Sequence, residues 1–193
     1  MTEAPGTHNP NVLPPNIPVP QDDGAAAHLA GMKLPDLALP ATQDAPVNLS
    51  KLTGRTVVYI YPRTGVPGVD TLPGWDQIPG ARGCTPQTCA FRDLFAELKA
   101  AGAAQVFGLS TQSNAYQTEM ASRLHLPFPV LSDEKLKLTR ALDLPTMEVA
   151  GLTLIKRLAL IVDDGRISHL FYPVFPPDRN AGDVLAWLKE NRG

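Results

Sequence analysis

The segment RTVVYIYP, residues 55–62, is the clearest indication of the fold of this chain. It is rich in β-branched and aromatic side chains, and Gly54 and Pro62 bound it, which is typical of a strand buried on both faces. After a long stretch rich in glycine and proline comes TPQTCAFRDLFAELKAAG, residues 85–102. Its apolar residues recur at helical spacing and Gly102 ends the pattern, so a buried strand followed by a helix is predicted.

The same alternation continues to the end of the chain. We expect an extended apolar stretch at 33–41, strands at 104–111 and 128–133, helices at 113–126 and 134–144, a hairpin around an Asp-Gly turn at 154–174, and a closing helix at 181–193. Strands that alternate with helices predict an α/β fold with a mixed central β-sheet flanked by helices, in which the hairpin adds antiparallel strands.

The bulk properties describe one ordinary domain of 193 residues, with 44% hydrophobic and 19% charged residues. Prolines crowd residues 1–30 and block helix and sheet pairing, so we expect an extended arm there and the folded domain at 31–193. The arm is either a passive extension or a surface for partners. A formal net charge of −2 without a basic stripe argues against nucleic-acid binding.

No apolar run reaches the roughly 20 residues that a membrane helix needs, and the first residues lack the pattern of a secretory signal. We therefore expect a cytoplasmic protein without a membrane segment. In a reducing compartment, two cysteines close together are more often catalytic or metal-binding than a permanent disulfide.

The only two cysteines are Cys84 and Cys89. Cys84 stands at the start of the predicted helix, where unpaired N–H groups and the helix dipole favour the reactive thiolate. In an intact helix the two Cα atoms would lie roughly 8.5 Å apart, whereas a disulfide tolerates at most about 7 Å. A bond between them requires at least the first helical turn to unwind, which favours a catalytic cycle over a structural staple.

Two other interpretations of the cysteine pair fit less well. A closed zinc site needs four ligands, and the four histidines do not stand at helical or knuckle spacing to the cysteines. A thioredoxin-type dithiol exchanger has two residues between its cysteines, whereas four intervene here. We expect neither a metal nor a cofactor.

The segment GCTPQTCAFRD, residues 83–93, resembles the GCT-x-x-x-C-x-x-RD stretch of Q-type peroxiredoxins, the bacterioferritin-comigratory subfamily. VVYIYP precedes this segment, and VFGLST, LHLPFPVLSD and KRLALIVDDGRISHLFYPV follow it, in the order that this family uses. The resemblance covers roughly Lys33 to Gly193 and implies a thioredoxin-like fold.

The resemblance also implies roles for individual residues. Cys84 would be the peroxidatic cysteine, which attacks a peroxide and becomes a sulfenic acid. Cys89 would be the resolving cysteine, which closes an intrasubunit disulfide that a thioredoxin-like reductant reopens. Arg157 matches the family arginine that stabilises the thiolate. The active form would be a monomer or a homodimer.

One departure from the family pattern concerns P-x-x-x-T-x-x-C. Cys84 lies 22 positions after Pro62 rather than seven, so about 15 residues, roughly 69–83, are inserted. By the resemblance, Pro62 would shield the thiolate from water, and Thr64 is the best substitute for the motif threonine, with Thr71 behind it. The insert, which carries Trp75, is either a flap over the pocket that tunes substrate size or an exposed flap whose Trp75 is buried simply for its apolar area.

The function that this implies is a thiol-dependent peroxidase for hydrogen peroxide and organic hydroperoxides. The alternative is a peroxide-sensing switch, or regulatory binding protein, that uses the same disulfide and the proline-rich arm to change partners.

Overall fold

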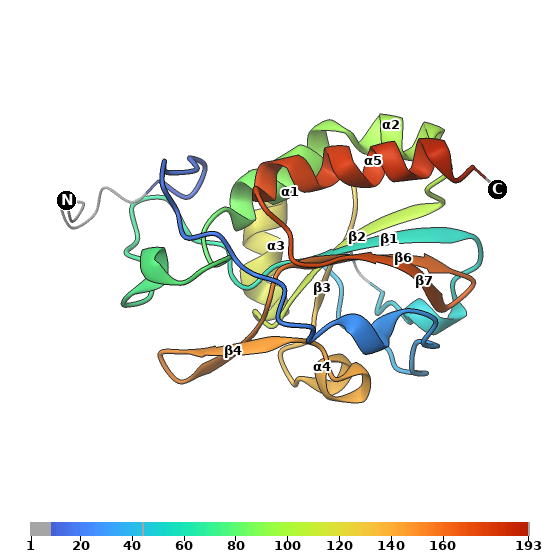
Figure 1. Ribbon diagram of the computed structural model, residues 1–193, viewed down its shortest axis with the longest axis horizontal. Coiled ribbons are helices and arrows are strands. Elements are labelled where there is room, and N and C mark those ends of the chain that lie inside the picture. Colours follow the sequence, from blue (N-terminus) through green and yellow to red (C-terminus); the bar gives the residue numbers. More distant parts are fainter. Residues whose placement is uncertain (1–8, 44, 193) are drawn as a thin grey trace.

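The computed structural model describes residues 9–43 and 45–192, and five strands form its central sheet in the order β3–β2–β1–β6–β7 (Figure 1). They are β1 (Arg55–Ile60), β2 (Gln105–Ser110), β3 (Val130–Ser132), β6 (Leu158–Asp163) and β7 (Arg166–Phe171). β1, β2 and β3 are parallel, whereas β6 is antiparallel to both β1 and β7. The predicted mixed sheet is confirmed, with the opening segment as its middle strand.

Helices cover both faces of the sheet, as expected (Figure 1). They are α1 (Cys84–Asp93), α2 (Phe95–Ala100), α3 (Asn114–Arg123), α4 (Lys137–Leu142) and α5 (Asn180–Glu190). In β1, Val57 and Tyr59 belong to the core beneath α1, α2, α3 and α5. Val58 and Ile60 belong to the opposite core, which α4 and the segment after the arm close. Side chains alternate across a strand, so one buried strand supplies both cores.

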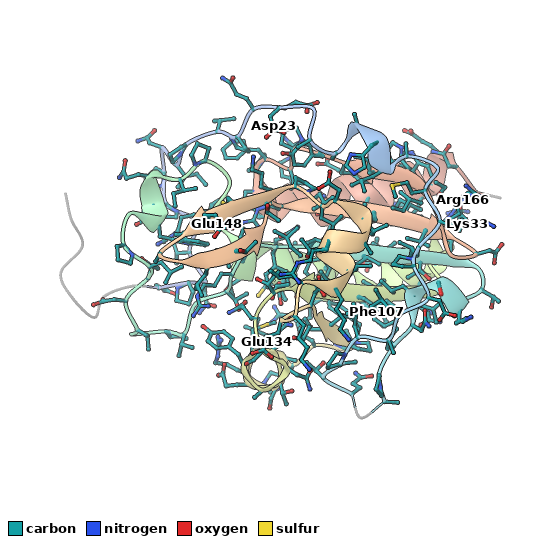
Figure 2. All side chains as sticks on the ribbon, turned by 90° about the horizontal axis from the view of Figure 1, so that it is seen from below. Asp23, Lys33, Phe107, Glu134, Glu148 and Arg166 are labelled. Carbon is teal, nitrogen blue, oxygen red and sulfur yellow. The ribbon has the colours of Figure 1, made fainter. Side chains whose placement is uncertain are left out.

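The predicted hairpin around Asp164 and Gly165 is confirmed as β6–β7. Both turn residues have positive φ, 48° and 76°, which is the geometry that a two-residue turn needs to match the twist of its strands. At the edge of the sheet, Lys33 forms an isolated bridge with Arg166, and Figure 2 shows the two residues side by side.

The structure differs from the prediction in three details. The stretch 33–41 makes only isolated bridges, because its prolines interrupt the ladder. The helix predicted at 85–102 is divided at Leu94 into α1 and α2. An additional hairpin, β4 (Thr146–Val149) and β5 (Leu152–Ile155), was not predicted. Its turn consists of Ala150 at φ 50° and Gly151 at φ 77°, and the two strands it joins are only four residues long, too short for a clear alternation of apolar and polar residues.

The arm lies against the body of the protein over its described part, residues 9–30. Ala26 and Leu29 are buried in the core, and the Gly31 amide donates to the carbonyl of Ile167. The boundary between arm and domain at residue 31 stays a prediction. Across the described ranges, none of the helices combines the length and the apolar character that crossing a bilayer requires.

Candidate active site

Cys84 is the first residue of α1, and only 4% of it is exposed. Gly83 precedes it with φ 97°, a left-handed conformation that glycine adopts without strain. The Gly83 carbonyl accepts the first helical hydrogen bond, from the Gln87 amide at 2.9 Å. This turn places the sulfur at the amino-terminal end of α1, where unpaired N–H groups favour an anion.

Arg157 brings its guanidinium to this sulfur from just before β6. Its Nη2 donates to Cys84 Sγ at 3.2 Å, and Arg157 is 3% exposed. The same Nη2 contacts the carbonyl oxygens of Gly80, Ala81 and Arg82 at 2.9–3.1 Å. These partners are carbonyl oxygens, which carry no net charge. Among the described residues they therefore do not neutralise the guanidinium, and its positive charge stabilises negative charge on the sulfur.

A buried relay holds the other side of the guanidinium. Arg157 Nη1 donates to Gln87 Oε1, and Gln87 Nε2 donates to Asn180 Oδ1 at 2.9 Å. Gln87 and Asn180 are each at most 1% exposed. The sequence indicated neither residue. Gln87 stands three positions after Cys84 and therefore on the same helical face, but only the tertiary structure brings α5 to it.

A cavity of about 140 Å³ opens at Cys84. It is lined by Pro10, Arg63, Thr64, Gly65, Val66, Val69, Asp70, Thr71, Leu72, Trp75, Arg82, Gly83, Cys84, Thr85 and Tyr116. Thr64 and Thr71, the two threonines named from the sequence, thus line the same cavity as Cys84. Pro62 is buried directly after β1 and lies outside this lining set.

Thr64 is held rigidly although a long insert separates it from Cys84. Its amide and its hydroxyl donate to Gln112 Oε1 at 2.9 and 3.1 Å, and Tyr116 OH donates to its carbonyl at 2.9 Å. Because the hydroxyl proton is used by Gln112, the oxygen faces other ligands as an acceptor. Gln112 and Tyr116 are further residues that the sequence did not indicate.

The insert is built as part of the site wall. Trp75 is 5% exposed and packs in a small core with Val149 and Leu154 of the β4–β5 hairpin, while it also lines the Cys84 cavity. Arg82, 6% exposed in its side chain, pairs with Asp76 at 2.9 Å. Trp75 both lines the cavity and fills a small apolar core. This position is compatible with a flap over the site, and equally with an insert whose Trp75 is buried only for its apolar area.

Cys89 lies on the same unbroken helix as Cys84, and both thiols are free. Cys89 is half-buried, and this burial raises the pKa of its thiol; Arg92 acts in the opposite direction and Asp93 adds to the rise. The intact helix between the two cysteines is the arrangement in which they cannot bond.

This chain is similar to known proteins along most of its length. The redoxin family matches residues 29–185. The chloroplastic peroxiredoxin Q of Sedum lineare is 31% identical, over 95% of this chain and 90% of its own length. Peroxiredoxin Bcp of Escherichia coli K12 is 33% identical, over 84% of this chain and 96% of its own length.

A solved structure agrees with the sequence relatives. The bacterioferritin comigratory protein of Xanthomonas campestris, studied for alkyl peroxide reduction, has a TM-score of 0.65 and 25% identity. The match covers 83% of this chain and 98% of that protein. With its thioredoxin-like sheet and its cysteine at the start of α1, the chain belongs to the redoxin family and, within it, to the Q-type (Bcp) peroxiredoxins.

Proposed function

We propose that this chain reduces hydrogen peroxide and organic hydroperoxides through a Cys84 sulfenic acid and an intrasubunit Cys84–Cys89 disulfide. Membership in the peroxiredoxins makes it a peroxidase, an oxidoreductase. The observation that carries the assignment to Cys84 is the contact between its sulfur and Arg157 Nη2 at 3.2 Å.

In the first step, the Cys84 thiolate attacks one oxygen of the peroxide. An S–O bond forms and the O–O bond breaks, so the sulfur is oxidised to a sulfenic acid and the peroxide is reduced. The leaving hydroxide or alkoxide takes a proton and departs as water or alcohol. Negative charge passes from sulfur to the leaving oxygen, and Arg157 can donate hydrogen bonds to both.

The relay behind Arg157 supports this step. A guanidinium held on one side by three carbonyls and on the other by Gln87 cannot swing away from the sulfur. Such preorganised charge is the usual source of electrostatic catalysis, because no reorganisation is needed during the reaction. Gln87 and Asn180 act as positioning residues, since they touch the guanidinium and each other rather than the substrate.

The cavity beside Cys84 is where the peroxide would bind. The Thr64 oxygen, whose proton goes to Gln112, accepts a hydrogen bond from the peroxide O–H and orients it. Pro62, buried two residues after the end of β1, has the water-shielding role that the family pattern implies, and it would act from behind the residues that line the cavity. The apolar wall from the insert contacts the organic group of a larger hydroperoxide.

In the second step, the first turns of α1 unwind and Cys89 attacks the sulfenic sulfur. An S–S bond forms, the S–O bond breaks, and the hydroxyl leaves as water after protonation. An external dithiol of the thioredoxin type then supplies two electrons, restores both thiols and becomes a disulfide itself. Because the disulfide is within one subunit, either a monomer or a homodimer can complete the cycle.

Intact mass measured after one equivalent of hydrogen peroxide tests the proposal. We expect the reduced chain to lose two hydrogens, and a proteolytic peptide to join Cys84 and Cys89. The Cys89→Ser variant should instead gain one oxygen at Cys84, and Cys84→Ser should stay unmodified. If Cys84→Ser retained peroxide turnover, the assignment would be wrong.

Turnover with a thioredoxin system separates a peroxidase from the alternative of a peroxide-sensing switch. A peroxidase consumes many equivalents of peroxide for each chain, whereas a switch is oxidised once and then persists as the disulfide. Repeated consumption of peroxide that depends on the reductant is the expected result.

A further inference from the structure

The described part of the proline-rich arm begins near the start of α1 and passes alongside the insert (Figure 1). Pro10, near its described beginning, is buried and lines the Cys84 cavity. Further along, Pro20 lies against Gly80, where an added Cβ would meet it at 3.5 Å. The arm therefore touches both the cavity at Cys84 and the carbonyl segment that binds Arg157.

Leu13 reaches the residue on which α1 begins. A Cβ added at Gly83 would come within 2.8 Å of Leu13 Cδ1 and would also collide with Pro177, so Gly83 is enclosed between the arm and the segment before α5. Gly83 carries the carbonyl that accepts the first hydrogen bond of α1. Leu13 thus packs against Gly83, the residue that begins the turn holding Cys84.

The arm is anchored on the far side of this contact. The Asp23 carboxylate pairs with Lys156 Nζ at 2.6 Å and accepts from Tyr172 OH at 2.7 Å; Figure 2 shows Asp23 on this segment. Leu29 follows, fully buried in the core. These contacts fix one end of the arm to the body, and the fixed end keeps the preceding residues of the arm close to Gly83.

From these contacts we propose that the arm supplies positioning residues, with Leu13 and Pro10 holding the first turn of α1 closed over Cys84. This inference rests on the proposed function, because closure of the Cys84–Cys89 disulfide requires that same turn to open. The arm therefore keeps Cys84 beside Arg157 for the reaction with peroxide and slows the reaction with Cys89.

A slower closure has a chemical consequence. The Cys84 sulfenic acid partitions between two reactions: condensation with the Cys89 thiol, which releases water, and attack on a second peroxide. The second reaction adds one oxygen to give a sulfinic acid and releases water or alcohol, and it takes Cys84 out of the cycle. The arm thus sets how much peroxide the protein tolerates before it is inactivated.

The test compares Leu13→Ala with two matched full-chain variants. Leu13→Met keeps the apolar volume at Gly83, and Val12→Ala changes the neighbouring residue, which is 55% exposed. We measure amide hydrogen exchange of the peptide that carries Gln87, with a β1 peptide as the internal reference. We also measure the rate of disulfide formation after one equivalent of hydrogen peroxide, and the sulfinic fraction at excess peroxide.

For Leu13→Ala we expect exchange at Gln87 and disulfide formation to be about three to ten times faster, because part of a leucine's burial energy is lost. The sulfinic fraction should fall, while Leu13→Met and Val12→Ala behave as the unchanged chain. Equal exchange in Leu13→Ala and Val12→Ala would overturn the proposal. A chain that forms no disulfide with peroxide would refute the proposed function, and the exchange comparison would still decide the role of the arm.

Discussion

The guanidinium of Arg157 lies 3.2 Å from the sulfur of Cys84, although 73 residues separate them in the chain. The register of the sheet explains this meeting. Ile60 pairs with Leu158 in the antiparallel ladder of β1 and β6, so Arg157 emerges where β1 ends. The loop that leaves β1 returns at Gly83 to begin α1, and its last carbonyls hold the guanidinium.

Replacing Arg157 with lysine should slow oxidation of Cys84 by about a hundredfold, the order found when one preorganised donor is removed from a catalytic site. A single ammonium group cannot contact the carbonyls, Gln87 and the sulfur together. Stopped-flow oxidation by hydrogen peroxide measures the effect. Arg55→Gln is the control, since Arg55 pairs with Asp163 and its loss should leave the rate unchanged.

The buried relay can be tested at Asn180. Asn180→Asp keeps an acceptor for Gln87 Nε2 and should retain most of the oxidation rate. Asn180→Leu leaves this amide unsatisfied, at a cost of about 1–3 kcal/mol in stability, and should lower the rate about tenfold as Arg157 loses its support. Equal oxidation rates in the two variants, measured on folded protein, would show that Asn180 is only structural.

Thr64 and Thr85 both line the cavity, but we expect opposite effects on kcat/KM when each is replaced by valine. Thr64→Val removes the acceptor offered to the peroxide and should lower kcat/KM for peroxide about tenfold, the value of one hydrogen bond. Among the described residues, the buried Thr85 hydroxyl has no hydrogen-bond partner, so Thr85→Val should leave kcat/KM unchanged. If Thr85→Val were the slower variant, the orienting role would belong to Thr85.

The pH dependence of disulfide closure follows from Cys89. Burial raises the pKa of this thiol, and only the thiolate attacks, so closure should accelerate as pH rises toward and through the pKa. Asp93→Asn removes a charge that raises the pKa and should move the profile to lower pH. Arg92→Gln should move it to higher pH. Quenched-flow rates from about pH 6 to about pH 10 cover the range, and a flat profile would contradict the prediction.

The insert should influence the choice of substrate. Leu72 lines the Cys84 cavity, so Leu72→Trp narrows the space left for an organic group. We expect the ratio of kcat/KM for cumene hydroperoxide to that for hydrogen peroxide to fall. Leu152→Trp, at an exposed position of β5, is the matched control. An unchanged ratio in Leu72→Trp would contradict the view of the insert as a flap.

The α/β alternation, the strand at 55–62 that is buried on both faces, and the cysteine at a helix start could all be predicted from the sequence alone. These features depend on periodicity and spacing over a few neighbouring residues, so they can be recognised before the fold is known. The family pattern around Cys84 and Arg157 also stands in the sequence as short motifs. Their meeting in space was an expectation from resemblance rather than from spacing.

Only the tertiary structure decided which residues surround Cys84. The relay from Arg157 through Gln87 to Asn180 joins two helices and a strand end, and Leu13 reaches Gly83 across 70 positions. Contacts of this kind arise when separate elements pack onto one sheet, and no local pattern encodes the partner. The same reason hid the β4–β5 hairpin, whose short strands gain their burial from the insert around Trp75.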